Sequence, residues 1–154
     1  MAAPRAWHPW LLASGGLLAH ALAVQLIPSP WLVPNFTLAG LIASVAAAPA
    51  AWLALSGLAG ALSMVWAGAG GAGGAAIALS YVAAGALVRL AAAHWDTTDA
   101  RVQTALTGLT ACLVTGTWLA GGLPRPWPVL AWAIVHIGLT TAAGWAVAGG
   151  WRDA

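Results

Sequence analysis

The sequence predicts an all-α protein, a polytopic bundle of helices that crosses a membrane. The 154-residue chain is 62% hydrophobic and only 5% charged, whereas soluble domains carry about a quarter charged residues. No charged residue occurs between Arg5 and Arg89, so long segments can enter a bilayer without burying a charge. We therefore expect a single integral membrane domain over residues 1–154.

Turn-forming residues divide this chain into about six apolar segments of roughly the length that a membrane span requires. We place the spans at about residues 9–27, 35–48, 51–67, 75–93, 102–119 and 127–147. The first segment is interpreted as a retained helix and not as a cleaved signal peptide, because further apolar segments follow it at once.

Prolines set the ends of the first three spans. Residues 28–34 contain three prolines, which prevent the first helix from continuing. Asn35 is a suitable cap for the second helix. Pro49 either kinks one long helix or separates two short ones. One helix over residues 35–67 would be about 50 Å long, too long for a hydrocarbon core of about 30 Å, so two helices with a turn at Pro49 are favoured.

Three further turns complete the division. Glycines over Gly68–Gly74 predict a turn before the fourth span, and residues 121–128 predict one before the sixth. Residues 93–101 form the most polar loop, where Asp96 or a neighbouring threonine can cap the fifth helix, with Asp99 in its first turn.

The arginines predict the orientation of the bundle. An even number of spans places both termini on one side, together with Arg5, Arg89, Arg101 and Arg152, and leaves Arg125 on the other. Because basic residues are retained on the cytoplasmic side, both termini are expected in the cytoplasm.

Little in the sequence supports catalysis. The chain has no glutamate, and its aspartates lie outside the predicted spans, so we expect no enzymatic activity and no cofactor or metal. The net charge of +2 is too small for a nucleic-acid-binding surface. The single cysteine, Cys112, is expected to be a buried core residue.

Two histidines, His20 and His136, lie within predicted spans. They could meet inside the bundle and bind a metal or carry a proton. Alternatively, each imidazole makes a single hydrogen bond to a neighbouring helix. The second interpretation is favoured, because the spacing matches no metal-binding motif.

The segment from Gly57 to Gly74 is the richest in small residues, and Ser56, Gly60 and Ser63 lie one helical turn apart in and before it. Small side chains let helices approach closely in a membrane. We expect Gly60 to be central to assembly, so that Gly60→Leu would disrupt it.

The order of features over about residues 11–90 resembles MreD, a small membrane subunit of the bacterial rod-shape machinery. The first span ends near Gln25, the pair Pro34–Asn35 opens the second, and the fourth ends at Arg89. The third is rich in glycine. Members of the family usually carry an acidic residue near the position of Met64, so the chain departs from the family there.

This resemblance implies a non-catalytic scaffold in the bacterial inner membrane. Its partner would be the bitopic protein MreC, and its complex would include the MreB filament, the RodA glycosyltransferase and a class B penicillin-binding protein. The partner-binding positions that the resemblance suggests are Gln25, Pro34, Asn35, Gly57, Gly60 and Arg89.

A second family has a similar architecture. The substrate-binding subunits of energy-coupling-factor vitamin transporters also have six spans and helices rich in small residues. That alternative implies a vitamin pocket near Gln25, Asn35 and the outer ends of the spans, with tryptophans stacking on the ligand.

Overall fold

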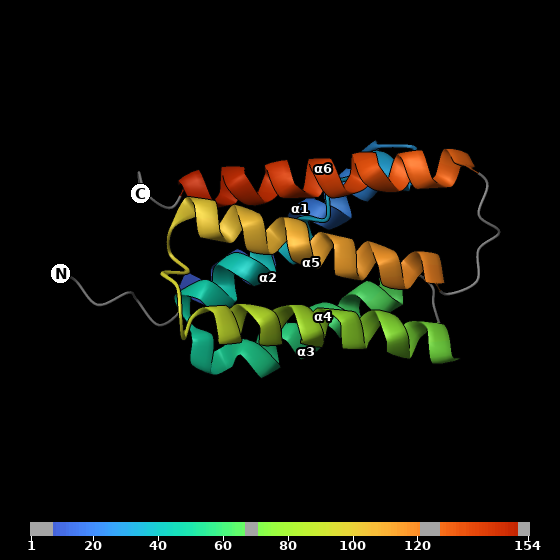
Figure 1. Ribbon diagram of the computed structural model, residues 1–154. Helices are drawn as coiled ribbons and strands as arrows, with labels where there is room; N and C mark the ends of the chain where they lie inside the picture. The colour runs from blue at the N-terminus through green and yellow to red at the C-terminus, as the bar shows by residue number, and fades with distance from the viewer. Residues whose placement is uncertain (1–7, 67–70, 121–126, 151–154) are drawn as a thin grey trace.

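The computed structural model describes residues 8–66, 71–120 and 127–150, which are almost entirely helical. The α-helices are α1 (His8–Leu26), α2 (Phe36–Ala47), α3 (Trp52–Trp66), α4 (Gly71–Ala91), α5 (Ala100–Ala120) and α6 (Trp127–Gly150), with short 3-10 helices η1 (Pro30–Leu32) and η2 (Pro49–Ala51). The described residues contain no strand, so the all-α class is confirmed. Consecutive helices run antiparallel, which brings the start of α1 and the end of α6 to one end of the bundle (Figure 1).

Each of the six segments predicted as spans contains one helix. At Pro49 the expected turn is confirmed, because α2 ends at Ala47 and the chain passes through η2 into α3. The amide of Ala48 donates to the Ser44 carbonyl at 2.9 Å and closes α2. Proline has no amide hydrogen to continue that pattern.

The turn predicted over Gly68–Gly74 is wrong for its second half, because α4 begins at Gly71 and not at Ala75. Gly71 has a φ of +62°, a value that glycine adopts without strain. Helical glycines cost about 1 kcal/mol each, but in lipid every backbone group needs a partner within the protein. Extending the helix through Gly73 and Gly74 provides those partners. Residues 67–70 lie outside the described chain.

Helices α1 and α2 pack closely against each other at small residues. A methyl group added to Gly16 would lie 2.5 Å from the Phe36 carbonyl oxygen, and one added to Gly40 would lie 2.8 Å from that of Leu12. The two glycines therefore face each other where the backbones of α1 and α2 touch, as small residues commonly do between helices in membranes.

The other two hairpins are closed in the same way. In α3–α4, a methyl group on Gly60 would lie 2.9 Å from the Ala78 carbonyl oxygen. In α5–α6 the contact is reciprocal. The Thr107 side chain of α5 packs against Gly144 of α6, and the Thr141 side chain of α6 packs against Gly108 of α5.

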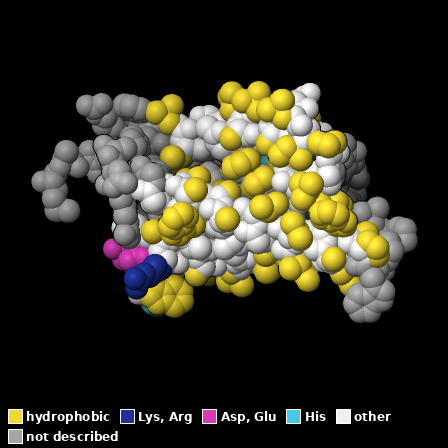
Figure 2. Space-filling view, turned by 90° about the horizontal axis from the view of Figure 1, so that it is seen from above, with side chains coloured by type: hydrophobic (Ala, Val, Ile, Leu, Met, Phe, Trp, Pro, Cys, Tyr) yellow, Lys and Arg dark blue, Asp and Glu magenta, His cyan; other side chains and the backbone are white. Residues whose placement is uncertain are grey.

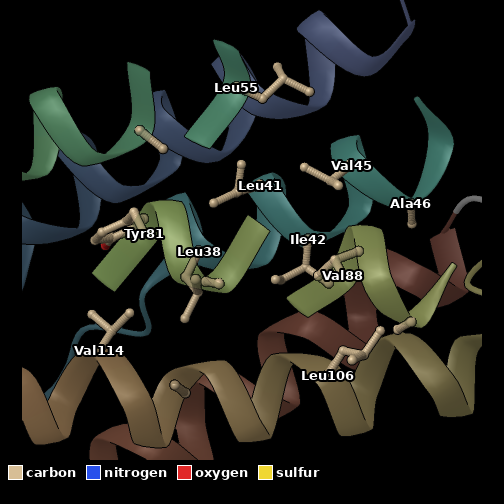
Figure 3. Packing of buried hydrophobic residues seen from close by; sticks show 14 of the residues in the cluster. Leu38, Leu41, Ile42, Val45, Ala46, Leu55, Tyr81, Val88, Leu106 and Val114 are labelled. Atoms are coloured by element: carbon tan, nitrogen blue, oxygen red, sulfur yellow. The ribbon is translucent and has the colours of Figure 1, made fainter. Parts of the chain in front are cut away.

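Helix α2 is the centre of the bundle. Every residue from Thr37 to Ala46 is buried, and α2 contacts all the other α-helices of the described chain. Its Leu38, Leu41 and Ile42 pack among side chains of α3, α4 and α5 (Figure 3). At 12 residues, α2 is about 18 Å long and is enclosed by protein rather than by solvent or lipid.

Candidate functional site

Polar side chains gather around the start of α2. The Asn35 side chain accepts a hydrogen bond from the Leu38 amide at 3.0 Å, which caps the helix as the sequence predicts. Its amide nitrogen donates to the Tyr81 hydroxyl at 2.7 Å. The Asn35 backbone N–H donates to the Thr140 hydroxyl at 2.9 Å. A single residue thus joins α2 to both α4 and α6.

This network reaches a fourth helix through Tyr81. The tyrosine ring is buried, and its hydroxyl also has a hydrogen bond to Ser63 of α3. Thr140 was not predicted as a partner. Tyr81 is the chain's only tyrosine, and because a buried tyrosine hydroxyl needs a partner, its position in an apolar segment was an available signal for a buried polar network.

The two histidines lie on either side of the segment that leads into α2. His20 of α1 places Nδ1 3.2 Å from the Pro34 carbonyl oxygen. His136 of α6 lies against Trp31, with ring centroids 6.2 Å apart in an edge-to-face arrangement, and faces the backbone of Val33. Its Nδ1 is buried without a hydrogen-bond partner.

His20 and His136 are near enough to interact electrostatically. Among residues 8–66, 71–120 and 127–150, however, no three histidine, cysteine, aspartate or glutamate side chains come close enough to hold a metal ion. His20 makes one hydrogen bond to the backbone, as the simpler of the two predicted roles requires. His136 differs from that prediction, because its ring packs edge-to-face on Trp31 and its buried Nδ1 has no hydrogen-bond partner.

The segment between α1 and α2 turns back deep into the bundle. Phe36 is level with Gly16, and from there α1 continues to Leu26 for about 15 Å at 1.5 Å per residue. Residues 27–35 therefore run back along the helix bundle, with Pro28 and Leu32 exposed and Val33 and Asn35 buried. Irregular backbone at such depth is stable only where protein groups satisfy it, and His20, Thr140 and Asn35 supply those groups.

The predicted partner-binding residues fall into separate places. Pro34 and Asn35 belong to this polar network, while Gln25 is exposed near the end of α1. Gly60 lies in the contact of α3 with α4, whereas Gly57 is exposed, and a methyl group there would meet no atom within 4 Å.

Arg89, the remaining predicted position, is exposed in the last turn of α4. The end of α4 lies at the opposite end of the bundle from the end of α1, which carries Gln25 (Figure 1). The six predicted positions therefore do not form one site. Cys112 differs from expectation, because it is exposed on α5 and not buried.

The loop before α5 holds the acidic residues of the described chain. Asp99 precedes α5 instead of lying in its first turn, and its carboxylate accepts from the Arg101 amide at 2.7 Å. Asp96 accepts from the Thr98 amide at 2.9 Å. Figure 2 shows the acidic and basic side chains gathered at one end of the molecule, beside a hydrophobic surface. Arg5, Arg125 and Arg152 lie outside the described residues.

By length and composition, α1, α4 and α6 could each cross a bilayer, over Pro9–Leu26, Gly71–Ala91 and Pro128–Gly149. The fold thus defines an all-α bundle with at least three apolar helices of membrane-spanning length, which indicates a membrane protein. No protein-family model, curated protein or solved structure matches the chain.

Proposed function

We propose that this protein is a non-catalytic scaffold subunit of the bacterial inner membrane with the role of MreD in the cell-elongation complex. In this proposal the chain crosses the membrane six times, with residues 27–35 and α2 together making the second crossing, and both termini lie in the cytoplasm. An MreC-type partner docks its single membrane-spanning helix on the bundle. RodA, a class B penicillin-binding protein and MreB join through that partner or directly.

The outward face of α3 supports this proposal. Gly60 and Ser56 face α4, while Leu53, Gly57 and Leu58 are exposed. Gly57 leaves open space in the middle of that face, so the backbone of another helix can come close. Such a contact needs no polar group. It therefore suits this chain, which has Met64 where members of the MreD family usually have an acidic residue.

The length of α3 gives a second argument. With 15 residues it is about 22 Å long, shorter than a hydrocarbon core of about 30 Å. A short helix exposed to lipid thins the bilayer or associates with another helix. A partner helix along α3 would relieve this mismatch.

Three glycine variants test the docking face. Gly57→Leu should lower recovery of a co-expressed MreC-type partner in mild detergent by roughly tenfold, a loss of about 1.4 kcal/mol. Gly138→Leu is the matched control, because Gly138 also lies on an exposed helix face with no atom within 4 Å of an added methyl group. It should retain the partner.

Gly60→Leu separates docking from folding. Its side chain would collide with the Ala78 backbone, so the variant should lower the thermal midpoint of the isolated protein, whereas Gly57→Leu should not. Failure of the unmodified chain to recover any MreC-type partner would overturn the proposal. Equal recovery by Gly57→Leu and Gly138→Leu would remove α3 from the docking role.

A second candidate is a vitamin-binding subunit of an energy-coupling-factor transporter. The observation that favours it is the gathering of Asn35, Tyr81, Thr140 and the two histidines around the start of α2 and the segment that leads into it. Such groups could hydrogen-bond a small polar ligand. This function requires that mass spectrometry of the purified, denatured protein reveals a bound vitamin, and that added vitamin raises the thermal midpoint. Absence of both rejects it.

A further inference from the structure

Two exposed tryptophans lie at the same level, meaning the same height along the axis of the bundle, toward the end of α5 and the start of α6. The reciprocal contacts of Thr107 with Gly144 and of Gly108 with Thr141 fix the register of the two antiparallel helices. Continued along the pair, this register sets Trp118 beside Trp132. Both side chains are exposed, by 40% and 43%.

The end of α1 lies at the same level. Gly16 of α1 is level with Phe36 of α2. The backbone amide of Asn35, which precedes α2, binds Thr140 of α6. Together these two contacts fix the height of α1 relative to α6. With α2 and α6 running in the same direction (Figure 1), this relation places Gln25 level with Trp132.

A second level lies toward the charged end of the molecule. Trp10 on α1 and Trp145 on α6 are both exposed, and the same register relations bring them within about one helical turn of each other. Arg89 and Arg101 are exposed nearby, at the ends of α4 and α5 that meet the polar loop. Tryptophan belts at both edges, with arginines extending to the headgroups, are typical of membrane proteins.

The two levels are unusually close together. From Trp132 to Trp145 the rise along α6 is about 20 Å, and from Trp10 to Gln25 along α1 it is about 22 Å. A typical hydrocarbon core is about 30 Å thick. Exposed Leu18, Leu22 and Ile134 fill the surface between the levels.

We propose that this surface fits a thin layer of lipid chains, about 20–24 Å thick, so that the protein binds short-chain phospholipid best and thins an ordinary bilayer around itself. The inference rests on the membrane location in the proposed function. A layer this thin would also match the length of α3, so the docking of a partner would then rest on the open face at Gly57 and not on mismatch. Mismatch between a protein and its bilayer costs fractions of a kcal/mol per Å, which is enough to make stability depend on chain length.

Reconstitution of the full chain in phosphatidylcholine vesicles tests this directly. The thermal midpoint, followed by helical circular dichroism, should be highest with acyl chains of about 14–16 carbons and roughly 5 °C lower with chains of about 22 carbons. A midpoint that peaks at about 18 carbons or more, or that does not vary with chain length, would overturn the proposal.

Depth measurements give a second, independent readout. Spin labels on Trp132→Cys, Gly138→Cys and Trp145→Cys, each in a Cys112→Ala background, should show position 138 deepest and the other two shallow. A label at 132 or 145 as deep as the one at 138 would contradict the thin layer. Release of the chain from vesicles by alkaline washing would instead reject the membrane location, and with it the proposed function.

Discussion

Asn35 combines three roles that are usually shared among several residues. Its side-chain oxygen caps α2, its amide group binds Tyr81, and its backbone N–H binds Thr140. The residue is 8% exposed, so each of these groups would be costly to leave unpaired. Asn35 is therefore the residue on which the re-entry of the chain into the bundle most depends.

Asn35→Ala should destabilise the protein by about 2 kcal/mol, from a lost cap of about 1 kcal/mol and a lost hydrogen bond of similar size. Tyr81→Phe should cost about 1 kcal/mol. Because both variants remove the same contact, the double variant should cost less than the sum. Unfolding in mixed micelles, followed by circular dichroism, measures all three.

Thr117→Val serves as the control, since the Thr117 hydroxyl bonds only the Leu113 carbonyl of its own helix. It should change stability by less than about 0.5 kcal/mol. Strict additivity of Asn35→Ala and Tyr81→Phe would show that the two side chains act separately.

At the scale of helices, the ends were predictable and the packing was not. Pro49 and Asn35 act on their immediate neighbours, so the turn and the cap could be inferred from local chemistry. Thr140 is 105 positions from Asn35, and no local pattern connects them. The central place of α2 was also missed, because alanine and glycine occur on nearly every helix face and hide which face is buried.

Two adjacent glycines of α1 test the contact between α1 and α2, because one lies in that contact and the other faces open space. Gly16→Leu should destabilise the protein by about 3 kcal/mol, since its side chain would push α1 away from Phe36. Gly15→Leu places the same side chain one position away, in open space, and should be neutral or slightly stabilising. Thermal unfolding of both variants in one detergent provides the comparison, and equal midpoints would contradict the glycine contact.

For the whole molecule, the antiparallel order of the helices brings both described chain ends to the end of the bundle where α4 ends and α5 begins (Figure 1). Arg89 and Arg101 belong to those turns of α4 and α5. If every helix crosses the membrane, that end faces the cytoplasm, because arginine is retained there.

A reporter fused after Ala154 should therefore be active in the cytoplasm. The matched fusion after Ala120, at the end of α5, should report the periplasm. A periplasmic signal from the fusion after Ala154 would contradict this topology.

The enclosed position of α2 also bears on the order of biosynthesis. Asn35 is made early, but Tyr81 lies two helices later and Thr140 belongs to the last helix. Until the ribosome has delivered α6, the entry segment of α2 lacks its final hydrogen-bond acceptor. Helix insertion can proceed pair by pair, but the native centre closes only when synthesis is almost complete.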